Sequence, residues 1–556
     1  MHGTDEQNLF YVTRSEVQTL PDVYSVQQRH FEYADLVGKM HAMMRSSKPA
    51  STFSAYIDVF MATVSPRLLR ISKLFRLSSR PSTSKHEWES EDMPIYEYVP
   101  EKGKHRRKSR LYGWGYAATG ELGIKEFLCP TYHEAPLEFT HKPCIIPFGD
   151  IHPVTLLILI HCRPFLLSVH HWAVTFCSNR LWLSLILRFL KLHQKGAPFV
   201  SSIACGVGYS VFIAKGSTNK LPTAYGTGVN VYHQLGFHPH NISPEQGVQY
   251  LIEPRQISLP LRFPDSTKVT HVACGKAHTV IATDNEGVYS LGSNEYGQCG
   301  RSIIENEDYT RSSISHKIDG LPSDVTEVVC GMDHTIIVDT NGKVYTFGCG
   351  LDGQLGYKSS WSNWQPTLVE GDIKNERIVQ VSCGADSVLA LSDKGEVFCW
   401  GNSECRQFGS VTTDMQVFEP RHLNLKIGPV RQVASGGSSC AVLTESGHIY
   451  AWGYGPLGLG PEQLFKGSRT LLPPPLFGAN EFRENIYPQR LFAGLMHYAV
   501  INSKGELYMW GRNKFGNLGL GHARYQYFPF KVSVNCDVRQ VAIGPYHTLA
   551  RCQTWL

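Results

Sequence analysis

The sequence lacks the short motifs by which many enzymes and cofactor-binding proteins are identified. It contains no Gly-x-x-x-x-Gly-Lys-(Ser/Thr) loop, which excludes a P-loop nucleotidase, and no Gly-x-Ser-x-Gly elbow of a serine hydrolase. It also contains no Cys-x-x-Cys pair, although 15 cysteines are spread along the chain. Several cysteines precede glycine inside apolar runs, so buried thiols of a reducing compartment fit better than a disulfide framework or a zinc site.

Charge is also scarce. Charged residues make up 18% of the 556 residues, and the formal net charge of +5 is too small to indicate nucleic-acid binding by itself. Glycine, with 50 residues, and the aromatic residues, at 11%, are instead plentiful. This combination is typical of many short strands joined by tight turns.

Two short sequence steps recur along the chain, seven times each. The first has the form of VACGKAHTV and the second the form of YTFGCGLDGQLG. In five repeats the glycine of the second step stands 17 residues after that of the first, as Gly292 follows Gly275. Such regular spacing indicates one structural unit that is copied along the chain. The glycines of the first step are Gly206, Gly275, Gly331, Gly384, Gly436, Gly494 and Gly544.

The residues between the two glycines predict a β-hairpin, because two β-forming runs flank a polar turn such as TDNEGV or DTNGKV. Flanking runs add strands, so each repeat forms a small antiparallel sheet, and radial stacking of such sheets gives a propeller. The first copy, near Leu111, has only the second step, and the last, at Gly544, has only the first. We therefore predict an all-β, seven-bladed β-propeller over residues 111–556, closed by pairing of the N- and C-terminal strands.

These repeats resemble those of the regulator-of-chromosome-condensation family. The shared pattern is Cys-Gly-x-x-His, then Gly-x-Val-Tyr-x-Trp-Gly-x-Asn, then Gly-Gln-Leu-Gly, and three blades depart from it with Tyr209, Ser387 and Ser439 at the histidine position. Four further stretches are similar to the mitochondrial member of that family encoded in the Williams–Beuren syndrome region. They are YLIEP, YGQCGRSIIENEDY, WGYGPLGLGP and QYFPFKV.

The resemblance implies a regulator that is not itself an enzyme and needs no cofactor. The founding member of the family is an exchange factor for a small GTPase, and the mitochondrial member is regarded as one for the dynamin-like GTPase of inner-membrane fusion. We therefore expect a mitochondrial GTPase as partner, with inner-membrane association through partners. Binding of mitochondrial ribosomal RNA and assembly factors, in large-subunit assembly, is the alternative. A nuclear, chromatin-bound exchange factor is a third hypothesis.

Binding residues are expected where the chain departs from the repeat, because loops on a rigid scaffold carry recognition. The variable loops are 301–320, 238–256 and 461–485, and solvated connectors are the alternative interpretation. The residues predicted to contact a protein partner are Arg301, Glu305, Glu307, Asp308, Arg311, Lys466 and Arg469. A concentrated basic run next to the first blade is the candidate for RNA or phosphate binding, unless it is a solvated linker. Its candidate residues are Lys104, Arg106, Arg107, Lys108 and Arg110.

The recurrent histidines and tryptophans are predicted to be structural. Each histidine should hydrogen-bond to neighbouring backbone and fix the glycine turn, because points on separate blades lie too far apart to share a metal ion. The histidines are His278, His334, His497 and His547. Trp114, Trp400, Trp452 and Trp510 should pack between blades. Two Gly-x-Gly-x-x-Gly matches, at 348–353 and 453–458, lack the following helix of a dinucleotide site, so we expect no catalytic, cofactor or metal residues.

Three segments stand outside the repeats. Residues 1–60 are predicted to be a non-repeat extension that is not necessarily translated. Residues 61–110 resemble a mitochondrial presequence with a linker, because Met61 to Lys85 hold six basic residues and no acid; a basic linker is the alternative. The hydrophobic insertion at about 147–195 contains arginines, so an artefact of gene prediction fits better than a membrane-surface element or a span. We expect a mitochondrial protein of the matrix or inner-membrane surface.

Overall fold

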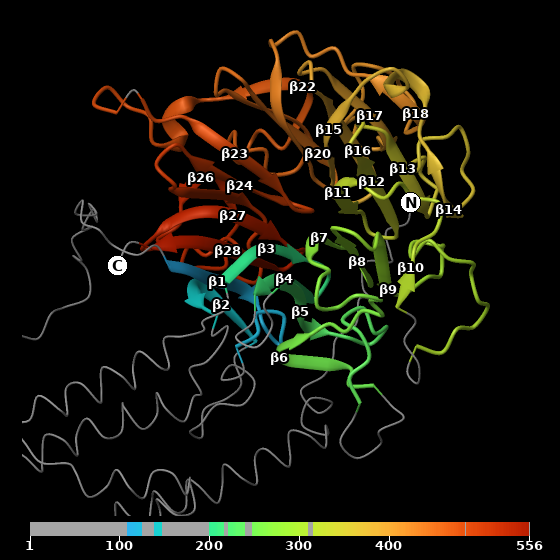
Figure 1. The fold of residues 1–556 in the computed structure, drawn as a ribbon. Helices are drawn as coiled ribbons and strands as arrows, with labels where there is room; N and C mark the ends of the chain where they lie inside the picture. The colour runs from blue at the N-terminus through green and yellow to red at the C-terminus, as the bar shows by residue number, and fades with distance from the viewer. Residues whose placement is uncertain are drawn as a thin grey trace, which may run out of the picture. The chain divides into compact units, whose positions relative to one another are not determined.

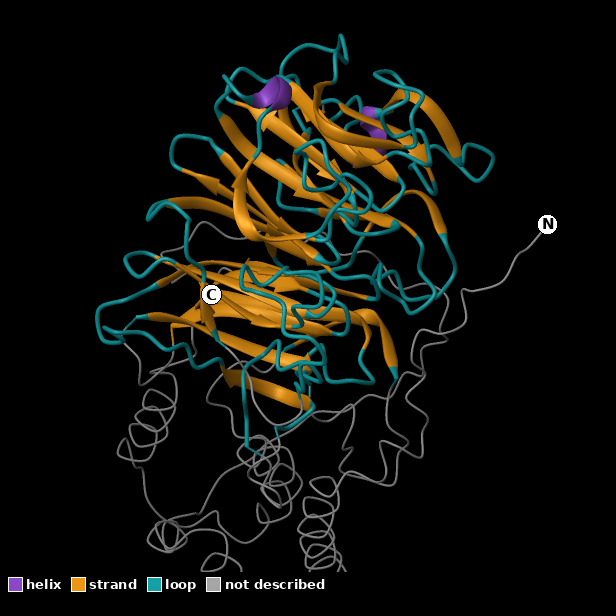
Figure 2. Ribbon diagram, turned by 90° about the vertical axis from the view of Figure 1, so that its right-hand side faces the viewer, coloured by secondary structure: helices purple, strands orange, loops and turns teal. Residues whose placement is uncertain are grey.

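The computed structural model describes residues 108–124, 138–146, 199–215, 221–239, 247–309, 315–483 and 485–554. All of them belong to one compact unit. Strands dominate the described residues, whose helical structure consists of two short 3-10 turns, η4 (Gly371–Ile373) and η5 (Pro474–Phe477) (Figure 2). No helix among the described residues has the length and apolarity of a membrane span. The predictions for residues 1–107 and for the insertion at 147–195 lie outside the described residues.

The strands form seven four-stranded antiparallel sheets, the blades of a β-propeller (Figure 1). From inner to outer strand, the blades are β3 (Phe199–Cys205), β4 (Tyr209–Lys215), β5 (Pro222–Val229) and β6 (Tyr250–Gln256); β7 (Val269–Cys274), β8 (His278–Thr283), β9 (Val288–Gly292) and β10 (His316–Lys317); β11 (Val325–Cys330), β12 (His334–Asp339), β13 (Val344–Gly348) and β14 (Asn363–Leu368); β15 (Ile378–Cys383), β16 (Ser387–Ser392), β17 (Val397–Asn402) and β18 (Gln416–His422); β19 (Val430–Ser435), β20 (Ser439–Thr444), β21 (Ile449–Tyr454) and β22 (Phe465–Leu472); β23 (Pro488–Ala493), β24 (His497–Asn502), β25 (Leu507–Gly511) and β26 (Gln526–Lys531); and β27 (Asp537–Ile543), β28 (His547–Thr554), β1 (Lys108–Tyr116) and β2 (Phe139–Ile145).

The first strand of each repeat lies innermost. Strands β3, β7, β11, β15, β19, β23 and β27 contact one another in that order, and β27 contacts β3, so the ring is closed. A cavity of about 220 Å³ lies against four of these strands, β15, β19, β23 and β27. The predicted seven-bladed, all-β architecture is confirmed.

The closing blade joins the two ends of the described chain. Strand β1 pairs with β28 over eight residue pairs, from Lys108 opposite Thr554 to Gly115 opposite His547. Figure 1 shows β1, in blue, beside β28, in red. Because the two strands pair, the ring closes without an exposed edge between its ends, as the split repeat predicted. Lys108 and Arg110 of the basic run therefore belong to the first strand, not to a linker.

The second strand of most blades is buried on both faces, because a neighbouring blade covers each side. In β8, β12, β16, β20 and β24 all six residues are buried. The hairpin turn between the second and third strands is fixed by polar contacts. In the blade of β12, the carboxylate of Asp339 accepts hydrogen bonds of 2.8 Å from the N–H groups of Asn341 and Lys343, while Gly342 takes a positive φ of 75°.

The tryptophans pack between blades, as predicted. The indole Nε1 of Trp400, which is fully buried, donates a hydrogen bond of 2.9 Å to the carbonyl of Gln354 in the preceding blade. Gly356 of that blade supplies the space, because a Cβ there would lie 3.1 Å from Nε1 of Trp400. Trp114 contacts Asn517 in the same way, at 3.0 Å.

Candidate functional site

Two kinds of connection meet at one end of the propeller, which we call the loop face. They are the turn between the first and second strands of a blade and the longer loop between its third and fourth strands. Since the strands are antiparallel, both connections leave the sheet at the same end. A hydrogen bond of 2.8 Å from the N–H of Cys349 to the carbonyl of Asp333 joins the two in the blade of β11–β14. The loop face therefore holds the described parts of the variable loops 238–256 and 301–320, whereas η5, between β22 and β23, belongs to the connections at the opposite end.

Buried histidines lie directly beneath this face and tie blade to blade. His278 is fully buried, and its Nε2 lies 3.1 Å from Oγ1 of Thr335 in the next blade. His547 reaches Oγ of Ser210 at 2.8 Å across the closing junction. Each ring thus lies against the glycine of its own turn, as that of His278 lies against Gly275, while its Nε2 contacts a side chain of the neighbouring blade.

Where the repeat carries His278, His334 or His547, the glycine of its first step is required by the histidine ring. A Cβ on Gly275 would lie 2.2 Å from Cε1 of His278, which is closer than two carbon atoms can approach. Burial also lowers the pKa of His278 to about 4 and that of His334 to about 3, so both rings are neutral at pH 7. Within the described residues, no three His, Cys, Asp or Glu side chains converge as a metal site requires.

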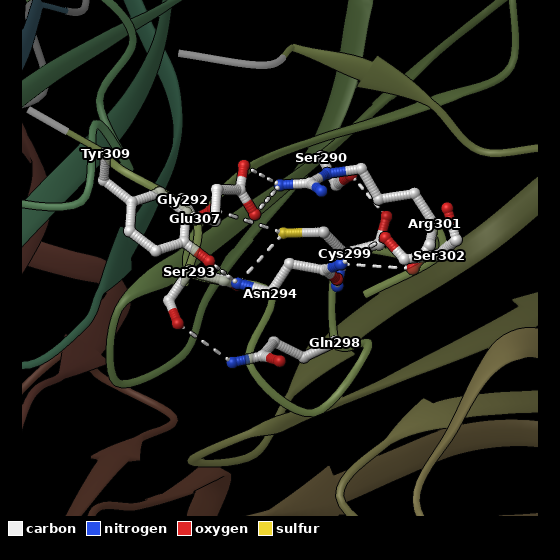
Figure 3. A network of polar contacts seen from close by, with 10 residues as sticks. All are labelled: Ser290, Gly292, Ser293, Asn294, Gln298, Cys299, Arg301, Ser302, Glu307 and Tyr309. Atoms are coloured by element: carbon white, nitrogen blue, oxygen red, sulfur yellow. Dashed lines mark hydrogen bonds and ion pairs between the residues drawn. The ribbon is translucent and has the colours of Figure 1, made fainter. Parts of the chain in front are cut away.

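Two of the predicted partner-contact residues instead form an internal ion pair (Figure 3). The guanidinium of Arg301 donates to both carboxylate oxygens of Glu307, at 2.5 and 2.8 Å, and the two side chains are only 7% and 11% exposed. Asn294 also holds this loop in place, because its Nδ2 donates hydrogen bonds to the carbonyls of Arg301 and Ser302, at 3.1 and 3.2 Å. Arg301 and Glu307 thus bind each other and hold their own loop, and their contact with a partner stays a prediction.

The anchored loop presents an apolar tip. Between Arg301 and Glu307 the side chains of Ile303 and Ile304 are 48% and 49% exposed, and Glu305 is exposed beside them. Tyr309 fixes the far end, because its hydroxyl accepts a hydrogen bond of 2.9 Å from the N–H of Asn294. Two adjacent exposed isoleucines on a fixed loop thus form a small apolar tip on the loop face.

The remaining predicted residues lie apart from this loop. Lys466 and Arg469 are half-buried on β22, so the expected connector 461–485 contains an outer strand and the turn η5. Asp308 follows Glu307 and is exposed, and Arg110 is exposed on β1, opposite Cys552. Arg311 and the first three residues of the basic run, Lys104, Arg106 and Arg107, lie outside the described residues. The predicted residues that the structure describes therefore do not come together in one site.

An acidic cluster on the loop face was missed by the sequence reasoning. Asp386 accepts a hydrogen bond of 3.1 Å from Nε2 of Gln354 and lies 3.9 Å from Nδ1 of His334. Burial, followed by the negative charges of Asp352 and Asp333, raises the pKa of Asp386 to about 6. Like charges thus crowd at one place on the loop face.

Asp333 shares this environment. Burial is the main cause that raises its pKa, and Glu295 adds to it, while Lys276, whose Nζ lies 4.0 Å away, acts in the opposite direction. Lys276 is therefore the one cation that the described residues place against this group of carboxylates, which come from three consecutive blades. The available signal in the sequence is an aspartate just before the histidine position in two neighbouring repeats, CGMDH and CGADS.

Models of known protein families match most of the described propeller. An RCC1-like domain matches residues 316–554, and the regulator of chromosome condensation (RCC1) repeat matches residues 223–282, 285–338 and 269–298. These matches agree with the blades that the structure shows.

Individual relatives extend the likeness over nearly the whole chain. The RCC1-like G exchanging factor-like proteins of Mus musculus and Homo sapiens are each 36% identical over 466 residues, which cover 84% of this chain and 91% of the relative. The crystal structure of human WBSCR16 is 34% identical, with a TM-score of 0.67, and covers 80% of this chain and 100% of that one. Yeast RCC1 (Prp20), in its complex with Kap60, shares the fold at 15% identity and a TM-score of 0.58, covering 86% of this chain and 97% of that one. Both resemblances drawn from the sequence are confirmed.

Proposed function

This chain belongs to the regulator of chromosome condensation repeat family, and we propose that it is a guanine nucleotide exchange factor for a GTPase. Relatives that are 36% identical along 84% of the chain carry the name of G exchanging factor-like proteins. The observation that carries the proposal is the loop face, where a fixed apolar tip at Ile303 and Ile304 accompanies an acidic cluster at Asp333 and Asp386.

This arrangement suits a protein that competes with a bound nucleotide. GTPases hold the phosphates of the nucleotide with a lysine and Mg²⁺, so loss of the nucleotide leaves positive charge without a partner. Carboxylates that repel one another in the free propeller gain the most favourable electrostatic energy when a cation of the GTPase approaches them. Asp333 and Asp386 would therefore favour the nucleotide-free GTPase and accelerate release, with no cofactor and no covalent step.

The proposed location of the protein and the proposed identity of its GTPase partner rest on the sequence. The presequence-like segment at 61–110 supports a mitochondrial location, in the matrix or at the inner membrane. The family resemblance supports the dynamin-like GTPase of inner-membrane fusion as the partner. A mitochondrial import assay of the full chain, with and without residues 61–85, tests the location separately from the activity.

The experiment that tests the function is nucleotide release. Full-length protein is added, below the concentration of the GTPase, to that GTPase loaded with a fluorescent GDP. Faster release with turnover supports an exchange factor. The double variant Asp333→Asn, Asp386→Asn should be slower, whereas Glu370→Gln, an exposed carboxylate in the connector after β14, should behave like the natural protein.

A second candidate function is binding of mitochondrial ribosomal RNA during large-subunit assembly. A different part of the loop face favours it, where Arg512, Lys514 and Arg524 are exposed without an ion-pair partner in the described structure. Crosslinking of the full-length protein to RNA in mitochondria would support this function, and it is measured independently of nucleotide exchange.

A further inference from the structure

A basic sector of the loop face surrounds the loop between β25 and β26. The chain from 507 to 536 contains no Asp or Glu, but it contains Arg512, Lys514 and Arg524, all exposed. The acids that flank this stretch are already paired: Glu506 with Lys531, at 2.7 Å, and Asp537 with Arg539, at 3.2 Å. The positive charge of the sector is therefore not neutralised from within.

The three cations lie on one rigid loop. Asn513, which is fully buried, donates from Nδ2 to the carbonyls of His522 and Arg524, at 2.7 and 3.1 Å. Its Oδ1 accepts a hydrogen bond of 2.9 Å from the N–H of Leu518. Asn513 stands between Arg512 and Lys514 and bonds to Arg524, so one buried side chain fixes the spacing of all three cations.

The closing blade adds a fourth cation. The N–H of Gly521 donates a hydrogen bond of 2.8 Å to the carbonyl of His141, which places β2 against the loop. Lys142, the next residue of β2, is exposed, and its Cε lies 3.7 Å from the position of a Cβ on Gly521. Glu138, just before β2, is exposed as well, so the sector keeps a clear excess of positive charge.

Aromatic rings stand among these cations. Phe515 lies edge-on to Tyr116 and to Tyr546, at ring-centroid distances of 5.2 and 5.3 Å, and Nζ of Lys514 lies 5.4 Å from the Phe515 centroid. Tyr525 follows Arg524 and is 42% exposed. Alternating cations and aromatic rings suit a strand whose phosphates and unstacked bases alternate.

We propose that Lys142, Arg512, Lys514, Arg524 and Tyr525 form a binding surface for single-stranded RNA. The cations contact phosphates, and Tyr525 offers a ring on which a base stacks. Because Asn513 fixes the backbone that carries Arg512, Lys514 and Arg524, no rearrangement of the loop is needed before a polyanion binds. The aromatic rings favour RNA over an acidic protein, which would need the cations alone. This inference rests on the RNA-binding function proposed above as the second candidate, and it names the surface.

The test is fluorescence anisotropy with full-length protein and a labelled, mixed-sequence RNA of about 16 nucleotides, the upper site size of common single-strand binders. The triple variant Arg512→Gln, Lys514→Gln, Arg524→Gln should bind about 10- to 100-fold more weakly. The slope of log affinity against log salt should become shallower by about 2, because three phosphate contacts are lost. Tyr525→Ala should weaken binding about tenfold without changing that slope.

The matched control removes the same charge at the other end of the propeller. Lys268, Lys374 and Lys394 are exposed cations on connections opposite the loop face, and their triple Gln variant should bind RNA like the natural protein. Thermal unfolding verifies that both triple variants fold.

The possible results distinguish an error in the proposed binding surface from an error in the proposed RNA-binding function. If the natural protein binds RNA and the Arg512, Lys514, Arg524 variant binds equally well, the surface is wrong while the RNA-binding function stands. If the natural protein does not bind RNA, the second candidate function fails together with the surface. If that variant instead loses binding to a polyglutamate peptide and keeps its RNA affinity, the sector recognises an acidic protein and the proposal is overturned.

Discussion

The side-chain amide of Gln432 forms two hydrogen bonds to the backbone of Leu491 in the next blade. Its Oε1 accepts from the N–H of Leu491 at 2.9 Å, and its Nε2 donates to the carbonyl of Leu491 at 2.7 Å. Gln380 repeats this arrangement with Val433, at 3.0 and 3.2 Å. The inner strands are edge strands, so one glutamine satisfies backbone groups that would otherwise face the central channel unpaired.

Glu327 occupies the equivalent place one blade earlier, four residues before the glycine of its repeat. It accepts a hydrogen bond of 2.7 Å from the N–H of Val381. An ionised carboxylate has no proton to donate to a carbonyl, whereas an amide has. Burial raises the pKa of Glu327 to about 8, so the acid is largely neutral at pH 7.

The substitution Glu327→Gln should therefore stabilise the protein, by about 1 kcal/mol at pH 8, after allowance for partial solvent screening in the channel. In the natural protein the pKa is higher in the folded than in the unfolded state, so stability is greatest below the unfolded pKa, near 4.5, and falls as pH rises to about 8. Thermal unfolding from pH 5 to 9 should show that the variant has the higher melting temperature, and that the difference from the natural protein widens as the pH rises. A constant gap would contradict this account of Glu327.

Gly275→Ala should destabilise the protein severely, by about 3 kcal/mol or more, because the new Cβ would overlap the ring of His278, 2.2 Å away. Gly320→Ala is the matched control. Gly320 has a positive φ of 79° but no heavy atom within 4 Å of a Cβ, so we expect a loss of only about 1 kcal/mol. Chemical denaturation of both variants measures the difference, and equal losses would contradict the role given to the histidine ring.

Arg301→Met should destabilise the loop and lower exchange activity together. It leaves Glu307 buried without its cation, and breaking such a pair costs about 3 kcal/mol. The double variant Ile303→Ala, Ile304→Ala should leave thermal stability nearly unchanged, since both side chains are half exposed, but should weaken binding to the GTPase. Calorimetric binding and thermal unfolding separate the two roles. If the isoleucine variant bound normally, the apolar tip would not be a contact site.

Asp386→Asn should make the free propeller more stable while it lowers the exchange rate. The carboxylate is ionised above its pKa of about 6 and is then repelled by Asp333 and Asp352. Removal of this charge should add about 1 kcal/mol at pH 7.5 and slow exchange about tenfold. Exchange by the natural protein should likewise decline as pH falls through 6. A variant that lost stability as well as activity would indicate a structural role for Asp386.

The sequence predicts the architecture well and the site poorly, for physical reasons. The spacing between glycines, as from Gly275 to Gly292, reports a local hairpin that every blade repeats, so fold and blade number follow from pattern alone. The split repeat at Leu111 and Gly544 likewise predicts the closing blade.

The partners of polar side chains, in contrast, depend on contacts between distant residues. Arg301 and Glu307 are charged and lie in a variable loop, which favours exposure, and only the fold shows that they neutralise each other. The cluster of Asp333, Asp352 and Asp386 combines residues from two blades, and although an aspartate precedes the histidine position in both repeats, only the fold shows that these carboxylates lie close together. The contact of His278 with Thr335 crosses 57 positions in the chain, which no local pattern reveals.

The measurement that tests the central claim most directly is release of fluorescent GDP from the dynamin-like GTPase of inner-membrane fusion, with full-length protein present at a fraction of the GTPase concentration. The account predicts repeated turnover by the natural protein and a strongly reduced rate for the Asp333→Asn, Asp386→Asn variant, with Glu370→Gln unchanged. If the natural protein left the release rate of this GTPase unaltered, or if the double variant matched it, the loop face would not be an exchange site for that partner.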